Sequence, residues 1–403
     1  MPTLTLVLGI VCAVGVLNAL RPVRLTVVML PFFFWGWLTA ELAPQLAVLL
    51  TVLVVVLVGL GGLSGTAGAI GVVLLLASLV GLVALIRSSE SAAAVADEVL
   101  SQWPDGPEPD SDVEVTSGLR RFFVPMSFTH PDVERVVDVV YSDESRRHRL
   151  DVYRHKDHPT GCPTLLQVHG GAWMIGDKRE QGRPLMLHLA SRGWVCFAPN
   201  YRLSPRATWP DHLVDVKRAL AWVRQHGEEY GADPGFVVLT GGSAGGHLVA
   251  EAALTANDPR YQPGFEHVDT SVAGCVPYYG VYDLSAETGT KSARIRRRHL
   301  LDRLVMKTSD EQAYLDASPL QQVNADAPPF LIIHGRNDTL VPVQEARLFA
   351  ERLRAVSRAP VLYLELPGTQ HAFDVFPSIR SAHVVRAVGR FLELLRQGAD
   401  AAR

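Results

Sequence analysis

The pentapeptide G-G-S-A-G at residues 241–245 places a serine between small residues. An apolar run at residues 236–240 precedes it, and a helical pattern follows. A serine hydroxyl is a poor nucleophile at neutral pH, so an enzyme that uses one presents it on a tight strand-to-helix turn, within reach of a base. Ser243 is therefore our candidate nucleophile, although the pentapeptide alone also fits an ordinary strand-to-helix turn.

A nucleophilic serine needs a base and an acid, and two later residues fit these roles. Asp338 follows the apolar run P-F-L-I-I-H-G-R-N, and His371 follows V-L-Y-L-E-L-P-G-T-Q. His371 would take the proton of Ser243, while Asp338 would fix the imidazole tautomer and stabilise the imidazolium. Three other residues near strand ends are interpreted as structural: Asp283, His334 and Asp374.

The third predicted strand ends in H-G-G-A-W at residues 169–173. Glycines allow backbone amides to approach a ligand closely, and such amides stabilise the oxyanion of acyl transfer. The sequence predicts an oxyanion hole in this turn, with the amides of Gly171 and Ala172 joined by that of Ala244. Gly170 belongs to the same site and supplies the turn. Two glycines by themselves also fit an ordinary turn.

No metal or cofactor site is predicted. The four cysteines are isolated and lack the paired spacing of a zinc site or a disulfide framework: Cys12, Cys162, Cys196 and Cys275. Three histidines lie among arginines and a lysine, whose charge opposes cation binding: His148, His155 and His158. We interpret that segment as a solvated polar turn.

Eight strand-like runs alternate with helical stretches after residue 120, which predicts one α/β domain. The first two runs are joined by a short polar turn, and most later ones by helices, so an antiparallel start should lead into a parallel sheet. The runs lie at residues 133–141, 149–154, 164–168, 195–199, 236–240, 273–279, 330–334 and 361–366. Residues 284–319 interrupt this alternation and are interpreted as a cap over the acyl pocket.

The first 87 residues differ sharply from the rest, because they carry only four charged side chains: Arg21, Arg24, Glu41 and Arg87. Their apolar stretches, at residues 3–20, 25–43, 45–59 and 66–86, each approach the length that spans a bilayer. We expect a transmembrane anchor of about four helices, with three spans or a re-entrant pair as alternatives. A hydrophobic hairpin packed on the globular domain would leave too much apolar surface exposed.

The domain boundaries follow from composition. Residues 1–87 form the anchor, residues 88–119 are rich in Ser, Ala, Pro, Asp and Glu and are expected to be a flexible linker, and residues 120–397 form the catalytic domain. An N-terminus without Lys or Arg argues against a cleaved signal peptide. Arg21 and Arg24 in the first short loop favour a cytoplasmic loop, and the remaining helices of a four-span anchor then favour an extracytoplasmic catalytic domain, against which Arg87 argues.

The motifs together resemble the α/β-hydrolase superfamily, in its esterase and lipase branch near hormone-sensitive-lipase-like enzymes. The resemblance covers about two thirds of the chain, and N-Y-R-L-S-P at residues 200–205 and H-G-R-N-D-T-L-V-P add to it. The usual H-G-G-G is replaced here by H-G-G-A-W, which is equally similar to feruloyl-esterase-like, isoprenylcysteine-methylesterase-like and kynurenine-formamidase-like relatives. The resemblance implies a cofactor-independent carboxylic ester hydrolase that works through an acyl-enzyme.

Three functions remain open at this stage. The favoured one is a membrane-anchored serine esterase or lipase acting on short-to-medium acyl, lipophilic esters. An acyltransferase would use the same acyl-enzyme, and a non-catalytic hydrolase fold would only bind a ligand. The net charge of −3 gives no support for nucleic-acid binding, and the sequence leaves the oligomeric state open.

Overall fold

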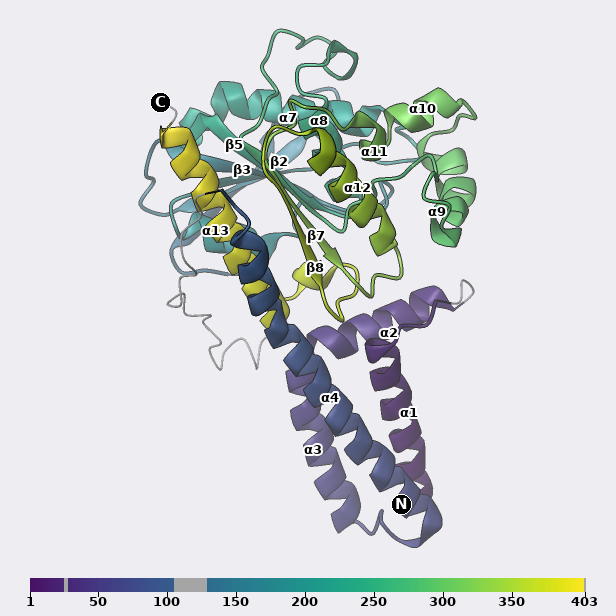
Figure 1. Ribbon diagram of the computed structural model, residues 1–403. Coiled ribbons are helices and arrows are strands. Elements are labelled where there is room, and N and C mark those ends of the chain that lie inside the picture. Colours follow the sequence, from purple (N-terminus) through teal and green to yellow (C-terminus); the bar gives the residue numbers. More distant parts are fainter. Residues whose placement is uncertain (25–27, 105–128, 402–403) are drawn as a thin grey trace.

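The computed structural model describes residues 1–24, 28–104 and 129–401. An eight-stranded sheet forms the centre of the larger part, in the order β1-β2-β4-β3-β5-β6-β7-β8 (Figure 1). The strands are β1 Val133–Val140, β2 Arg149–His155, β3 Cys162–Val168, β4 Val195–Pro199, β5 Ala232–Gly242, β6 Gly274–Tyr278, β7 Phe330–Gly335 and β8 Val361–Leu366. Strand β2 pairs antiparallel with β1 and β4, and all other pairs are parallel. The predicted mostly parallel sheet with an antiparallel start is confirmed.

Helices cover both faces of the sheet, as parallel strands require. On one face lie α7 Asp211–His226, α8 Ala244–Leu254 and α12 Val343–Val356, which share a buried cluster with Leu166, Phe197 and Ile332 of the strands. On the other lie α6 Arg183–Ala190 and α13 Ile379–Ala401, which pack on Leu165, Cys196 and Ile333. Figure 1 shows the layers.

The predicted cap segment leaves the sheet after β6 and returns at β7. It carries α9 Lys291–Arg296, a π-helix Arg297–Val305, α10 Glu311–Asp316 and α11 Pro319–Gln322. Leu301 is fully buried, and Arg296 pairs with the buried Glu345 at 2.7 Å. The cap segment is therefore joined to α12 by a buried ion pair.

Four helices precede the sheet: α1 Pro2–Leu20, α2 Met29–Glu41, α3 Ala43–Gly59 and α4 Gly65–Leu100. Helices α1 and α4 pack closely, since a Cβ on Gly9 would lie 2.6 Å from the carbonyl oxygen of Gly71. Within the described residues, α1 and α4 are long and apolar enough to cross a membrane, and α2 with α3 adds a third span only as one bent unit.

The prediction of four separate membrane spans is wrong, because α2 is too short to be one. Its 13 residues reach only about 20 Å, less than the ~30 Å hydrocarbon core of a bilayer. It also meets α3 at a bend of 87°, so that it lies across one end of the bundle, while α4 continues past it toward the sheet (Figure 1).

The prediction of a flexible linker from residue 88 onward is wrong for residues 88–100. Helix α4 continues unbroken to Leu100, and its second half packs against α13 and the sheet. Two ion pairs join the helices, Glu90 with His383 at 3.0 Å and Asp97 with Arg390 at 2.6 Å. Alanines and serines look like linker composition, but here they let two helices approach. Residues 105–119 of the expected linker lie outside the described residues.

The end of α1 lies beside the α/β domain, where the Asn337 side chain donates a hydrogen bond to the Leu20 carbonyl at 3.4 Å. The chain start and the turn between α3 and α4 lie at the opposite end of the bundle (Figure 1). The loop that carries Arg21 and Arg24 is therefore at the same end of the bundle as the α/β domain.

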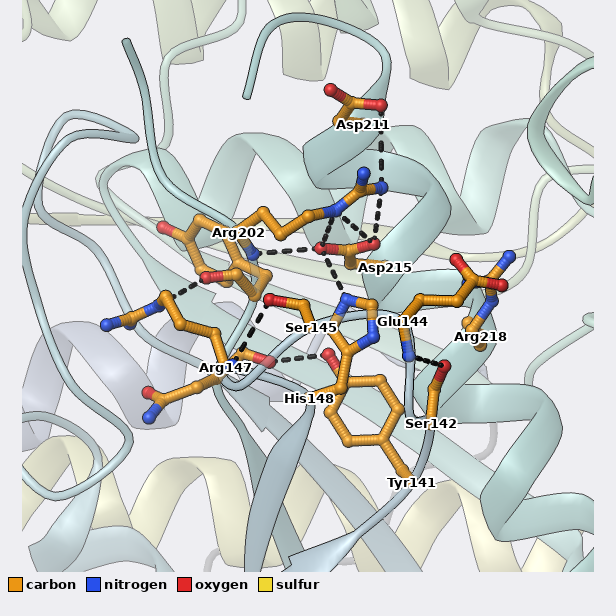
Figure 2. Close-up of polar contacts among 12 residues, drawn as sticks. Tyr141, Ser142, Glu144, Ser145, Arg147, His148, Arg202, Asp211, Asp215 and Arg218 are labelled. Carbon is orange, nitrogen blue, oxygen red and sulfur yellow. Dashed lines mark hydrogen bonds and ion pairs between the residues drawn. The ribbon is translucent and has the colours of Figure 1, made fainter. Parts of the chain in front are cut away.

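The prediction that His148 lies in a solvated turn is also wrong. Its side chain is fully buried and lies 3.0 Å from Asp215 of α7, which in turn binds Arg202 at 2.8 Å (Figure 2). Burial alone would raise the pKa of Asp215, but the hydrogen bonds from His148 and Arg202 outweigh it and lower the pKa. Tyr141 stacks beside His148, with ring centroids 5.0 Å apart. The β1–β2 hairpin is thus fixed to α7 by a buried polar cluster.

If residues 88–100 belong to the core of the α/β domain, Leu100→Ala should destabilise that domain. Removing a buried leucine side chain costs about 2–5 kcal/mol, so thermal unfolding of the full chain in nanodiscs should begin several degrees lower. The exposed neighbour Glu98→Ala serves as the control and should leave the unfolding temperature within about 1 °C. Equal unfolding temperatures for the two variants would mean that this half of α4 only tethers the domain.

Candidate active site

Ser243 lies on a strained turn between β5 and α8. Its backbone has φ 58° and ψ −119°, a conformation that L-residues adopt only when their surroundings enforce it. Its amide donates a hydrogen bond to the Tyr278 carbonyl at 3.0 Å, and a Cβ on Gly245 would lie 2.2 Å from the Val168 carbonyl oxygen. The turn is thus packed against β3 and β6, and only glycine fits at residue 245.

His371 and Asp338 form a hydrogen-bonded pair after β8 and β7. Nδ1 of His371 lies 2.6 Å from Oδ2 of Asp338, and both side chains are buried. The other carboxylate oxygen accepts the amides of Leu340 and Val341 at 2.9 and 2.8 Å. A carboxylate can only accept, so Nδ1 carries the proton and Nε2 is free to act as a base.

Asp338 remains ionised in this environment. Burial alone would raise its pKa, but the charge of His371 and the hydrogen bonds from His334 and His371 outweigh burial, and the pKa lies well below its ordinary value. The His334 ring contacts the same carboxylate at 3.3 Å. An ionised Asp338 can stabilise an imidazolium on His371 throughout the neutral range.

Ser243 and the His371–Asp338 pair both lie beside the end of β6. The Ser243 amide donates to the carbonyl of Tyr278, and the ring centroids of Tyr279 and His371 are 4.4 Å apart. Within the described chain, no hydrogen bond joins the Ser243 hydroxyl directly to His371. Catalytic hydrogen bonds often tighten only when substrate binds.

The turn after β3 presents backbone amides beside Ser243. A Cβ on Gly170 would lie 3.1 Å from the Ser243 Cβ, and Gly171 and Ala172 both have positive φ, at 115° and 52°. No hydrogen bond among the described residues occupies the amides of Gly171, Ala172 or Ala244. These amides are available to an oxyanion.

Gly170, which the sequence placed in the same site, has its amide engaged by Oε1 of Gln181 at 2.8 Å. It therefore supplies the close turn but not an oxyanion donor. Gln181 lies in a loop without a recognisable pattern, and nothing in the sequence indicated it.

The side chain of His169 also contacts the turn after β3. Its ring stacks on Tyr201 with centroids 4.4 Å apart, and Nδ1 donates to the Gly170 carbonyl at 2.7 Å. Burial, only partly offset by that hydrogen bond, lowers the pKa of His169 to about 4, so the ring is neutral at pH 7. Tyr201 lies in the N-Y-R-L-S-P motif, which was the sequence signal for this contact.

The competing carboxylates have other partners. Asp374 accepts a hydrogen bond from the Tyr279 hydroxyl, and Asp283 accepts from Ser285, Glu287 and Thr288 at the root of the cap. Among the described residues, no group of three or more His, Cys, Asp or Glu side chains is arranged to hold a metal ion.

The sheet order, the strained serine turn and the late Asp–His pair define the α/β-hydrolase class of proteins. The family BD-FAE matches residues 150–353, half of the chain, and the chain belongs to this family.

Two curated relatives come from Mycobacterium tuberculosis. The probable carboxylic ester hydrolase LipM is 56% identical over 63% of this chain and 60% of the relative, and esterase LipQ is 46% identical over 64% and 62%. The chain thus spans less than two thirds of the length of these relatives. Among solved structures, esterase 2 of Thermogutta terrifontis is similar with a TM-score of 0.54 and 28% identity, over 65% of this chain and 94% of that one.

The pairing predicts that Asp338→Asn will lower kcat for a p-nitrophenyl ester by about 10³ to 10⁴-fold, because an amide favours the wrong histidine tautomer. KM should change little, since Asp338 does not contact the ester. Asp374→Asn and Asp283→Asn, compared under the same conditions, test the alternative acids. A larger loss of kcat in either of these two variants would reassign the acid.

Proposed function

We propose that the chain is a membrane-anchored serine carboxylic ester hydrolase that uses Ser243, His371 and Asp338. The observation that carries the proposal is the 2.6 Å pair of His371 and Asp338 beside a strained serine turn and unoccupied backbone amides. The names of LipM and LipQ as ester hydrolase and esterase support the same reaction.

In the acylation step, Nε2 of His371 takes the Ser243 proton as Oγ attacks the ester carbonyl. The tetrahedral oxyanion accepts hydrogen bonds from the amides of Gly171, Ala172 and Ala244. The intermediate then breaks the bond to the alcohol, whose oxygen takes the proton from His371. Asp338 stabilises the transient imidazolium and keeps its negative charge throughout.

In the deacylation step, His371 removes a proton from water as the water oxygen attacks the acyl carbonyl. A second tetrahedral intermediate forms at the same amides, and its collapse releases the carboxylic acid. The proton on His371 returns to Ser243 Oγ, which restores the free enzyme. No cofactor or metal is needed for this cycle.

The substrates proposed are short-to-medium acyl esters of lipophilic character. The apolar helices α1, α3 and α4 expose many large aliphatic side chains and would hold the hydrolase domain at a bilayer. The cap segment between β6 and β7 would cover the acyl pocket.

A fluorophosphonate probe should label the wild-type protein in membranes, and Ser243→Ala should lose both the label and the hydrolysis of p-nitrophenyl butyrate. Loss of the nucleophile alone typically removes about 10⁶-fold of kcat, so turnover should fall to background. A serine outside the site, Ser142→Ala, is the matched control and should label normally. Label or turnover that survives in Ser243→Ala would show that another residue is the nucleophile.

We also propose that the hydrolase domain faces the cytoplasm. Arg21, Arg24 and Arg87 all lie at the end of the bundle that meets the domain, since Leu20 contacts Asn337 and Ser88 contacts Pro367. The far end, at the turn between α3 and α4, carries no charged residue. Positively charged loops are retained in the cytoplasm, so this arrangement favours a cytoplasmic domain.

Cysteine accessibility in intact cells tests this orientation. A membrane-impermeant maleimide should label Ser64→Cys at the turn between α3 and α4, but should label Glu228→Cys in the hydrolase domain only after the cells are permeabilised. Both positions are exposed, and the wild-type chain gives the background, because three of its cysteines are buried. The reverse labelling pattern would place the domain outside the cell.

A further inference from the structure

Helix α2 contacts the loop that carries the catalytic histidine. Nε1 of Trp37 donates a hydrogen bond to the carbonyl of Ala372, the residue after His371, at 3.0 Å. The ring of Phe33 lies edge-on to the His371 ring, with centroids 6.5 Å apart. Trp37 also packs on Phe376, with centroids 4.8 Å apart. A helix from the anchor thus forms the surroundings of His371.

Both ends of α2 are fixed in this position. At its C-terminal end, the Glu41 carboxylate pairs with Arg380 and accepts a hydrogen bond from Ser378 at 2.6 Å, and both charged side chains are buried. Near its start, the Asn18 side chain of α1 donates to the Phe32 carbonyl at 2.6 Å. Buried charges that are paired tolerate little displacement, because separation would leave each without a partner.

The opposite side of α2 exposes large apolar side chains. Leu30, Phe34, Trp35 and Leu38 are all exposed, while Phe33, Ala40 and Glu41 on the other side are buried. The helix lies across the end of the bundle, beneath the hydrolase domain (Figure 1). Aromatic residues favour the boundary between lipid and water, so this side suits the membrane surface.

We propose that α2 is part of the substrate site, and the proposal rests on the ester hydrolysis argued above. Its buried side carries Phe33 beside His371, and Phe33 is a specificity-determining residue that contacts the apolar chain of the ester. Its exposed side, which includes Leu38, rests on the membrane surface and does not contact the substrate. Trp37 is a positioning residue that holds the loop of His371 through the carbonyl of Ala372. The substrate class is therefore a membrane-dissolved ester with its carbonyl at the membrane surface.

This arrangement explains why Ala372 can hold its unusual conformation. Ala372 has φ 58°, a left-handed conformation that costs an alanine free energy unless its surroundings enforce it. The hydrogen bond from Trp37 to its carbonyl is one such constraint, and the packing of Phe373 within the core is another. Loss of the indole donor should therefore allow the loop, and with it His371, to shift.

The test uses the full chain in nanodiscs, with active sites counted by fluorophosphonate labelling. Initial rates are measured per labelled site on p-nitrophenyl acetate and p-nitrophenyl decanoate. The variants are Phe33→Ala, Trp37→Phe and, as a control on the exposed side, Leu38→Ala. Counting sites separates a positioning effect from poor folding, since misfolded protein reduces the number of labelled sites and not the rate per site.

Trp37→Phe keeps an aromatic ring but loses the N–H donor. Per labelled site, kcat should fall about threefold to tenfold for both esters, in proportion to one lost hydrogen bond, with KM nearly unchanged. Phe33→Ala should lower the decanoate-to-acetate ratio of kcat/KM by about tenfold, because two or three chain methylenes lose their contact. Leu38→Ala should match the wild type on both esters.

Each outcome decides a separate point. If Phe33→Ala and Trp37→Phe behave per site like Leu38→Ala, α2 only attaches the domain and the inference is wrong, while hydrolysis dependent on Ser243 still stands. If the wild type neither labels nor turns over, the proposed reaction is wrong and the role of α2 falls with it. Should Phe33→Ala yield no folded protein, Phe33→Leu provides the same ratio, with a smaller decrease expected.

Discussion

The absence of side chains where β3, β5 and β6 meet is the constraint on which the active site depends. A Cβ on Gly170 would lie 2.6 Å from the carbonyl oxygen of Gly242, and one on Gly246 would lie 2.8 Å from that of Tyr278. Any larger residue would push the turn of Ser243 away from its neighbours. Because the three strand ends approach so closely, the serine is held in a strained conformation and backbone amides lie beside it. The same packing therefore positions the candidate nucleophile and the candidate oxyanion donors.

The arrangement of the candidate site was largely predictable from the sequence, because each of its residues follows an apolar run within a few positions. Strand ends in a parallel sheet converge on one edge, so Ser243, Asp338 and His371 could be placed together by their order alone. The sheet itself followed from the same runs. The order of these residues along the chain could not predict which backbone amides are already hydrogen-bonded and which are available to an oxyanion. Gly170 was expected to supply the turn of this site, and its amide is engaged by Gln181, a residue without a motif.

Composition misled the sequence reasoning where a contact joins distant segments. Residues 142–148 are polar, as a solvated turn would be, yet His148 is buried against Asp215 (Figure 2). Residues 88–100 have the small and charged residues of a linker, but Ala92 and Ala96 pack in the core between α4 and α13. In both cases the partner lies far along the chain. A local sequence pattern shows which side chains are polar or small, but it does not show which distant residues they contact.

Helix α2 shows the same limit of local sequence patterns among the apolar N-terminal helices. It also links these helices to the candidate active site. Hydropathy measures how apolar a segment is, whereas its direction depends on the bend before α3 and on Glu41, a charged residue that finds its partner, Arg380, in the hydrolase domain. Within the described residues, α1 and α4 are each long and apolar enough to cross a membrane, and α2 lies across the bundle. Helix α4 runs without a break from this bundle into the hydrolase core. Since α2 and α4 both contact segments that follow β8, the anchor fixes the orientation of the His371 loop as well as the position of the domain.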